Sequence, residues 1–212
     1  MAAVRRYRAI DRGHRVSIRL VRTRKDLESV RALFREYGGW LAQHREITTF
    51  DDSILATGLA KMDEEIRQLP GDYSLPRGAL LLVSRGRRLI GCGALRPLGP
   101  EVGELKRVDI RSSYRGQGLG RRLTLALVER ARRLGYRRLL LDTLPGMTSA
   151  INLYRSLGFE PVPRYWDHPF PAALFFGLEL RRNGTVAGRA RVGARPGRSG
   201  VPADRRHLAR PS

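Results

Sequence analysis

The stretch Arg115-Gly116-Gln117-Gly118-Leu119-Gly120 separates a strand-like run, 102–110, from a long helical pattern that begins near position 118. Its three glycines leave backbone N–H groups free to point at one ligand and let that ligand approach closely. The N-terminus of the following helix adds partial positive charge. The surrounding arginines add full charges: Arg111, Arg115, Arg121 and Arg122. The stretch therefore predicts an anion site suited to a phosphate or pyrophosphate.

The spacing disfavours two well-known phosphate loops. A dinucleotide-binding loop reads G-x-G-x-x-G, but counted from Gly116 the third glycine comes one place early because position 121 is arginine. A P-loop needs Gly-Lys followed by Ser or Thr, which the stretch lacks. A glycine-rich turn that binds no ligand stays open as the alternative, since such loops are weak signals by themselves.

Strand-like and helix-like segments alternate around this stretch. We expect helices where apolar residues recur every three or four positions, and strands in short apolar or alternating runs. The expected strands are 16–21, 78–84, 88–95, 102–110, 138–141, 159–163 and 172–180, and the expected helices are 26–37, 51–69, 118–134 and 148–157. Gly38-Gly39 is expected to end the first helix. This order predicts an α/β (α+β) fold, a single domain with a mixed central sheet and helices on both faces.

Composition excludes several classes of protein. The 212 residues are 42% hydrophobic and 29% charged, a balance typical of a globular chain that buries a core without disulfides. Cys92 is the single cysteine and is expected to be buried rather than reactive. The four histidines show no metal-ligand spacing, so no metal is predicted. No apolar run approaches the roughly 20 residues that span a bilayer, and no secretory signal is visible. We therefore predict a cytoplasmic protein without a membrane partner.

Much of the formal net charge of +21 is concentrated near the two ends of the chain. The basic segment 1–15 and the Arg-, Gly- and Pro-rich tail 181–212 are expected to be disordered, which leaves 16–180 as the folded domain. Two interpretations of the tails stay open: weak, non-specific binding to polyanions, or a biased composition without a partner. The tail 181–212 carries no aromatic residue that could stack on bases.

The glycine stretch and a second motif together resemble the GNAT superfamily of acetyl-CoA-dependent N-acetyltransferases. The family motif [Q/R]-x-x-G-x-[G/A] reads Arg115-x-x-Gly118-x-Gly120 here. The later signature, a tyrosine followed by an apolar residue, Gly and Phe, reads Tyr154-Arg155-Ser156-Leu157-Gly158-Phe159. The resemblance implies a GNAT-like fold over 16–180, acetyl-CoA as co-substrate, an amine-bearing small molecule or peptide as acceptor, and a homodimer as one oligomeric state.

The resemblance also implies roles for particular residues. The pantetheine arm of coenzyme A would lie along the strand 102–110 and bond to the backbone of Val108 and Ile110. The pyrophosphate would be held by Arg115, Gly116, Gln117, Gly118, Leu119, Gly120 and Arg121. Tyr154 matches the tyrosine that protonates the leaving thiolate, a role that its phenol can fill as a general acid. Glu104 stands where histone-acetylating relatives carry the general base; the alternative is a strand residue paired with Lys106 or an arginine.

One position departs from the family pattern. Many relatives carry an asparagine seven residues before the tyrosine, where it contacts pantetheine, but this chain has Met147 there. The loop 142–147 resembles that of a bacterial subgroup. We therefore do not transfer the asparagine role to this chain.

The acceptor is expected opposite the cofactor, between the connection of the first two helices and the last loop. The polar and aromatic candidates are Trp40, His44, Tyr165, Trp166, Asp167 and His168. Capping of the core edge by the aromatic residues is the alternative. For the whole chain, an acyl-CoA-binding regulatory or nucleic-acid-associated module with little turnover is the alternative to an N-acetyltransferase.

Overall fold

The computed structural model describes residues 15–44 and 51–180. The predictions about the segments 1–15 and 181–212 fall almost entirely outside these residues. The strands are β1 Val16–Leu20, β2 Ala79–Arg85, β3 Arg88–Pro97, β4 Val102–Ile110, β5 Arg138–Thr143, β6 Glu160–Pro161 and β7 Leu174–Glu179. The helices are α1 Arg24–Gln43, α2 Asp52–Gln68, α3 Leu119–Arg133 and α4 Thr148–Ser156, with short 3-10 turns η1 Gly71–Tyr73 and η2 Ser112–Tyr114.

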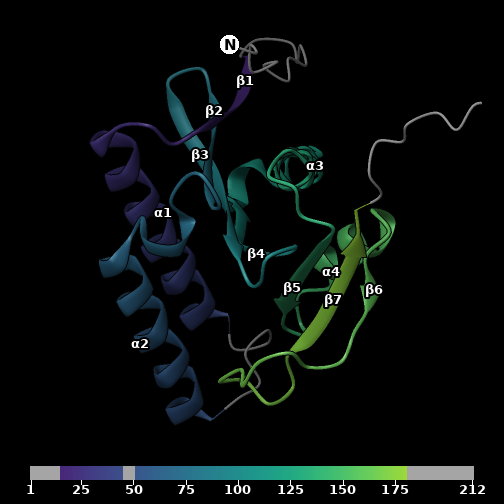
Figure 1. The fold of residues 1–212 in the computed structure, drawn as a ribbon. Helices are drawn as coiled ribbons and strands as arrows, with labels where there is room; N and C mark the ends of the chain where they lie inside the picture. The colour runs from purple at the N-terminus through teal and green to yellow at the C-terminus, as the bar shows by residue number, and fades with distance from the viewer. Residues whose placement is uncertain (1–14, 45–50, 181–212) are drawn as a thin grey trace, which may run out of the picture. The chain divides into compact units, whose positions relative to one another are not determined.

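The strands form one mixed sheet in the order β1-β2-β3-β4-β5-β7-β6. Strands β4 and β5 pair in parallel, whereas the other neighbours pair antiparallel. Helices α1 and α2 lie side by side on one face of the sheet, and α3 and α4 cover the other face (Figure 1). The predicted fold class and the order of the main elements are therefore confirmed.

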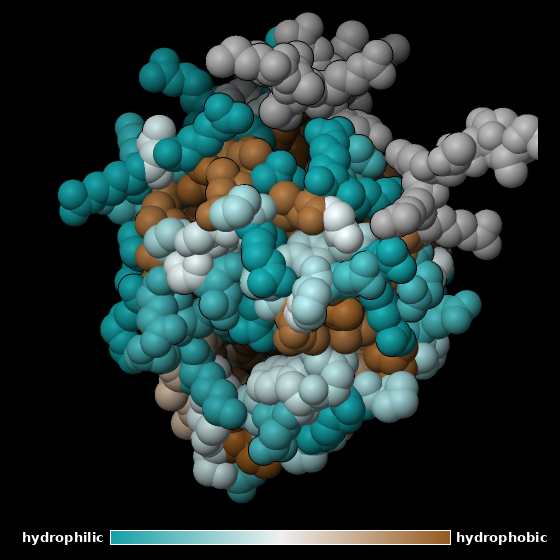
Figure 2. Space-filling model, in the orientation of Figure 1, coloured by the Kyte–Doolittle hydropathy of each residue, from teal (hydrophilic) through white to brown (hydrophobic). Residues whose placement is uncertain are grey.

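Each face of the sheet has its own apolar core. On the α3 and α4 face, Leu123 and Leu127 of α3 pack with Leu139 and Leu141 of β5 and are almost completely buried. On the α1 and α2 face the packed residues are Val30, Phe34, Met62, Ile66, Leu82 and Cys92. Cys92 is buried as expected, and burial raises the pKa of its thiol. The face seen in Figure 2 carries mainly hydrophilic residues, with hydrophobic patches between them.

The prediction that Gly38-Gly39 ends the first helix is wrong. Helix α1 continues through both glycines to Gln43. A Cβ atom on Gly38 would lie 2.0 Å from the terminal methyl of Met62 on α2, so the absence of a side chain lets the two helices pack closely. The extra turns carry Trp40 on the helix rather than in a linker, and they bring the end of α1 to the cofactor side of the molecule.

The start of α1 is fixed by a capping box. The Asp26 backbone N–H donates to the Thr23 hydroxyl, and the Asp26 carboxylate accepts from the backbone N–H of Arg22 and Thr23. The Arg19 guanidinium also binds Asp26 with two hydrogen bonds of 2.6 and 2.8 Å. These donors hold the pKa of Asp26 well below its usual value. The carboxylate therefore joins β1 to α1 only while it is ionised.

We expect Asp26→Asn to lower the free energy of unfolding by about 1–2 kcal/mol at neutral pH, because the cap and the Arg19 ion pair weaken together. The folded-state pKa lies below the unfolded value of about 3.9, so the contribution is present above about pH 4 and is lost as the pH falls further. Urea unfolding at pH 7 and pH 3 measures this. The exposed control Asp63→Asn should change little at either pH, and an equal deficit of the Asp26 variant at both pH values would contradict the assignment.

Strands β4 and β5 separate along their length. Their pairing ends at Leu105 opposite Leu141, although β4 runs on to Ile110 and β5 to Thr143. A bulge in β4 accompanies the separation: the register with β3 shifts between Cys92 and Ala94, and Arg107 takes a positive φ of 53°. The bulge re-aims the strand. The second half of β4 therefore faces an opening in the sheet instead of a ladder partner.

Candidate active site

The opening between β4 and β5 offers backbone hydrogen-bonding groups to a ligand. In the described part of the chain, no ladder pairing to β5 is found for β4 beyond Leu105. Val108 and Ile110 lie in this unpaired half, the place where a pantetheine arm is expected. Backbone groups without partners bind an extended ligand as an added strand would. The carbonyl of Ile110 already accepts from Arg115, so the pantetheine contacts of Val108 and Ile110 stay a prediction.

The glycine stretch stands at the far end of β4. Gly116 and Gly118 have φ angles of 75° and 70°, and Gly118 is the N-cap of α3. A Cβ atom on either glycine would meet no atom within 4 Å, so open space adjoins both residues. Left-handed glycines before a helix N-terminus have the backbone geometry of an anion cradle, as this stretch is called below, and its binding of a phosphate stays a prediction.

The side chains near the cradle are only partly available to a ligand. The Arg115 guanidinium donates to the Ile110 carbonyl at 2.8 Å and to Asp109 at 3.0 Å. Arg111 pairs with Glu36 of α1. Both arginines therefore fasten β4 to its surroundings.

Two further contacts join the cradle to neighbouring elements. Arg121 donates to the Ser156 hydroxyl of α4 at 2.9 Å, and Gln117 accepts from Arg85 of the β2–β3 hairpin at 3.1 Å. The cradle is thereby held between the hairpin and α4.

We expect Gly118→Ala to raise the dissociation constant of acetyl-CoA about tenfold or more. The new methyl group strains the left-handed backbone by roughly 1 kcal/mol and enters the space in front of the N–H groups. Gly135, at the other end of α3, is a matched control, because its φ is 87° and a Cβ would also meet nothing within 4 Å. Isothermal titration of both variants measures the effect. Equal affinity in the two alanine variants would show that the cradle does not hold the cofactor.

Tyr154 lies on α4 beside the opening and is 7% exposed. Its ring packs against Phe159, with centroids 5.7 Å apart. Within residues 15–44 and 51–180, no hydrogen bond is found for its hydroxyl. Burial, together with the fields of Tyr37 and Asp142, raises the pKa of Tyr154 above its usual value. The phenol therefore keeps its proton and has a free donor.

Met147 and Tyr37 stand near the same place. Met147 is the N-cap of α4. Its sulfur accepts hydrogen bonds from the hydroxyls of Thr143 at 3.6 Å and Tyr37 at 3.9 Å. Tyr37 comes from the part of α1 that precedes the two glycines. A thioether and two hydroxyls thus occupy the position where many relatives carry an asparagine. Sequence reasoning missed this contact although Tyr37 lies in the predicted helix, because its partner Met147 is 110 positions away in the chain.

Glu104 is completely buried in β4. Its Oε2 accepts from Arg96 of β3 at 2.6 Å, and its Oε1 accepts from the Tyr165 hydroxyl at 2.8 Å. Lys106 lies 3.9 Å away. The carboxylate is thus paired with an arginine, as the alternative interpretation expected. The Tyr165 hydroxyl covers its other oxygen.

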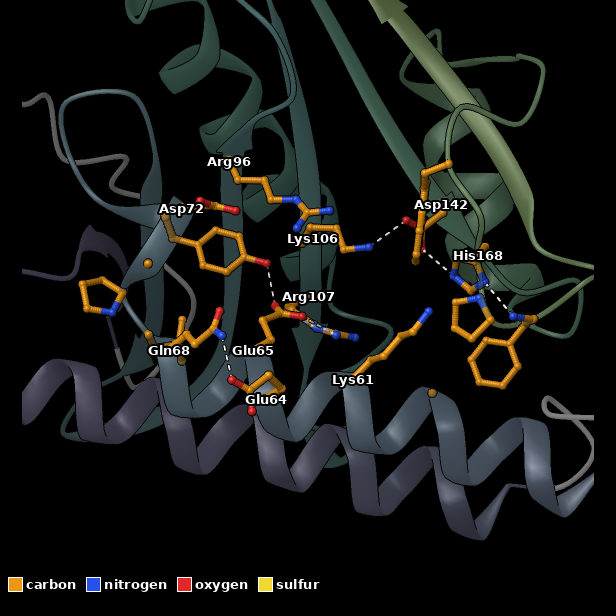
Figure 3. A pocket seen from close by; sticks show the side chains of 18 residues that line it. Lys61, Glu64, Glu65, Gln68, Asp72, Arg96, Lys106, Arg107, Asp142 and His168 are labelled. Atoms are coloured by element: carbon orange, nitrogen blue, oxygen red, sulfur yellow. Dashed lines mark hydrogen bonds and ion pairs between the residues drawn. The ribbon is translucent and has the colours of Figure 1, made fainter.

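A cavity of about 330 Å³ lies between α2 and the sheet. Glu65 of α2 binds Arg107 directly at 2.6 Å, and Lys106, Asp142 and His168 lie in a row at one end of the cavity (Figure 3). Lys106 and Asp142 stand on β4 and β5 where the two strands begin to separate. The cavity therefore approaches the opening from the face of α1 and α2.

The six expected acceptor residues are divided by the structure. Trp166 and His168 line the cavity, and Tyr165 contacts Glu104. Trp40 stacks on Arg115 at 4.3 Å and lies beside His44, near the cofactor cradle. The side chain of Asp167 is fully exposed. Most of the cavity wall comes from residues that the sequence reasoning did not select: Glu65, Tyr73, Arg96, Lys106, Arg107 and Asp142.

The described residues contain no group of acidic, histidine or cysteine side chains that could hold a metal ion. Among the same residues, no helix is both long and apolar enough to cross a membrane.

The fold agrees with comparisons to known proteins. The chain belongs to the acetyltransferase (GNAT) family, whose model matches residues 27–159. An uncharacterised N-acetyltransferase of Schizosaccharomyces pombe is 31% identical over 170 residues, which cover 79% of this chain and 96% of that protein. Matched relatives come from this fungus and from Escherichia coli alike, so the matches do not separate a bacterial subgroup.

Solved structures share the fold at low identity. An acetyltransferase from Streptococcus agalactiae has a TM-score of 0.61 and 20% identity, covering 78% of this chain and 98% of that chain. YncA of Salmonella typhimurium, solved with its cofactor acetyl-CoA, has a TM-score of 0.54 and 21% identity, covering 78% and 94%.

Proposed function

We propose that this chain moves an acetyl group from acetyl-CoA to a primary amine by direct transfer. The observation that carries this proposal is the end of the β4–β5 pairing at Leu105, which leaves half of β4 open to an extended ligand. The anion cradle lies at the end of this half-strand, Tyr154 lies beside it, and the cavity approaches it from the other face. A cofactor and an acceptor can therefore meet at the opening from opposite sides.

The cofactor arrangement follows the chemistry of coenzyme A. Its pyrophosphate binds the N–H groups of Gly116 to Gly120 and the helix N-terminus. Its amide-containing pantetheine arm pairs with the backbone at Val108 and Ile110. The backbone N–H of Val108 stabilises the carbonyl oxygen as it gains negative charge, because the Ile110 N–H already donates to Asp109.

Acetyl transfer then needs three bond changes and two proton movements. The neutral amine attacks the thioester carbon, and the C–N bond forms as the carbonyl electrons move to oxygen. The tetrahedral intermediate collapses, the C–S bond breaks, and sulfur leaves with the electron pair. Tyr154 donates its phenolic proton to that sulfur, and the ammonium nitrogen of the product loses a proton to become an amide.

Glu104 has a place in the second proton movement. Both oxygens of Glu104 already accept hydrogen bonds, so Glu104 does not contact the amine directly. The proton instead reaches Glu104 through the Tyr165 hydroxyl. The amine proton passes by way of water to the Tyr165 oxygen while the Tyr165 proton moves to Glu104. A concerted shift of this kind forms no phenolate, which burial and the nearby Glu104 charge would oppose by raising the pKa of Tyr165.

Release of the CoA thiol across a panel of primary amines tests the proposal. The panel holds polyamines, aminoglycosides, short peptides and free amino acids, and purified protein is first shown to bind acetyl-CoA by titration. Acetylated product from at least one amine class supports the transferase. Binding of acetyl-CoA without product from any amine would replace it with the alternative, a binding module with little turnover.

A further inference from the structure

The cavity between α2 and the sheet has more hydrogen-bond donors than it uses. In the described part of the chain, Arg96 donates to a carboxylate through Nε alone, and Arg107 through Nε and Nη2. Lys106 uses one of its three N–H donors, toward Asp142 at 2.7 Å. The remaining nitrogens of the two arginines are not enclosed, so they border open space. Three cations therefore hold donors available to a ligand.

Other residues of the cavity wall add to this surplus. The indole nitrogen of Trp166 is buried, and it has no partner within the described ranges. Figure 3 shows Lys61 extending from α2 toward the same space. A buried donor without an acceptor costs free energy, which a ligand oxygen would recover.

The carboxylates of the wall, in contrast, are already engaged. Glu65 accepts from Tyr73 and from two nitrogens of Arg107. Asp142 accepts from Lys106 on one oxygen and lies 3.3 Å from Nε2 of His168 with the other. The backbone N–H of Phe170 donates to the other ring nitrogen of His168, Nδ1, at 3.0 Å.

Asp72, on the exposed turn η1, is the exception, because no partner is found for it among the described residues. Deep in the cavity, the wall therefore has spare hydrogen-bond donors, and the group that is missing is a hydrogen-bond acceptor.

We propose that the acceptor is a small amine that also carries a carboxylate, such as an α-amino acid or a short peptide, and that Lys106, Arg107 and Arg96 bind that carboxylate. This inference rests on the proposed function, because the amine of the same molecule must reach the thioester. Lys106 lies where β4 and β5 begin to separate, so a carboxylate held there keeps an attached amine near the opening.

Size and charge agree with such a ligand. The cavity volume of about 330 Å³ lies at the lower end of the roughly 300–1,000 Å³ typical of small-molecule sites. Arg96, Lys106 and Arg107 are balanced by Glu104, Asp142 and Glu65. A molecule with one ammonium and one carboxylate adds no net charge to this balance. A polyamine would instead add positive charge to a wall that already presents spare cationic donors.

The first test compares each L-amino acid, and each of a set of dipeptides, with its own C-terminal amide. Thiol release from acetyl-CoA gives kcat/KM for both members of every pair. We expect the best free acids to exceed their amides at least tenfold, and the two arms show whether amino acids or peptides are preferred. Equal or higher values for the amides would overturn the inference while leaving the acetyltransferase in place.

A second measurement keeps the inference testable without turnover. The chain has two tryptophans, so Trp40→Phe leaves Trp166 in the cavity wall as the reporter. Titration of this variant, loaded with acetyl-CoA, should show saturable fluorescence changes with the acids at lower concentration than with the amides. If no amine is acetylated but this difference persists, the proposed function fails and the carboxylate site stands. Identical titration curves for the acids and their amides would contradict the carboxylate site.

Replacement of Lys106 identifies the binding group. Lys106→Met should lower the ratio of acid to amide kcat/KM several-fold, because Arg96 and Arg107 remain; general loss of structure would lower both values and keep their ratio. Lys25→Met, on the exposed first turn of α1, is the matched control and should keep the wild-type ratio. A wild-type ratio in the Lys106 variant would show that the preference arises elsewhere.

Discussion

Tyr154→Phe is expected to lower kcat for acetyl transfer about 100-fold while changing the KM for acetyl-CoA by less than about twofold. The substitution removes one oxygen and keeps the ring that packs against Phe159. The hydroxyl has no hydrogen bond to lose within the described residues, so stability should be nearly unchanged. What disappears is the proton donor to the departing sulfur. Steady-state thiol release with an acceptor identified in the amine panel measures both constants.

Tyr136→Phe is the matched control, because its hydroxyl donates at 2.8 Å to the Arg77 carbonyl at a distance from the opening. That variant should lose about 1 kcal/mol of stability and retain kcat.

The pH dependence of kcat gives a further check on Tyr154. Burial raises the pKa of Tyr154, so the phenol keeps its proton, and with it its role as an acid, to higher pH than a free tyrosine would. Wild-type kcat should therefore not fall between about pH 8 and pH 10 through this group. Similar kcat values in the two variants would remove Tyr154 from the mechanism.

The parts of the molecule that could be predicted from the sequence are those set by local chemistry. Strand β4 begins and ends at the predicted residues, and α3 ends at Arg133, one residue before the predicted end. The glycine stretch leads into α3 as expected, because φ angles near 70° at its glycines are a property of the stretch itself. The predicted helix over 26–37 is shorter than α1, because the end of α1 is set by a long-range contact and not by local chemistry. Whether Gly38 stops a helix depends on Met62, and no local pattern contains that contact.

At the acceptor side, the sequence named Trp166 and His168, which line the cavity, and Tyr165, which contacts Glu104, but not most of the cavity wall. The contacts that build the site join residues far apart in the chain. In the cavity wall, Glu65 and Arg107 are 42 positions apart. Outside the cavity, Tyr37 and Met147 are 110 positions apart. Each would pass for an ordinary surface or core residue until the sheet and helices bring it to its partner. Sequence spacing therefore predicted the cofactor end of the site, which stays a prediction, and most of the cavity wall was found only in the structure.

Glu104→Gln is expected to lower the free energy of unfolding by about 3 kcal/mol, because it leaves Arg96 without its buried counter-charge. The Arg96 side chain is 27% exposed, so water in the cavity relieves part of the cost and places the effect at the low end for buried pairs. The same substitution removes the final proton acceptor reached through Tyr165. We therefore expect kcat at saturating acceptor to fall about 100-fold, measured below the unfolding temperature of the variant.

The double variant Arg96→Met/Glu104→Gln separates the two effects of the substitution. Removal of both charges leaves no unpaired ion, so about 2 kcal/mol of the lost stability should return. The proton acceptor is still missing, so kcat at saturating acceptor should stay low. Recovery of kcat together with stability would mean that Glu104 serves only to hold Arg96 in place. Arg96 also belongs to the proposed carboxylate site, so the single variant Arg96→Met is measured beside the double variant. Recovery of stability alone, with kcat at saturating acceptor retained in Arg96→Met, would identify Glu104 as the group that receives the proton.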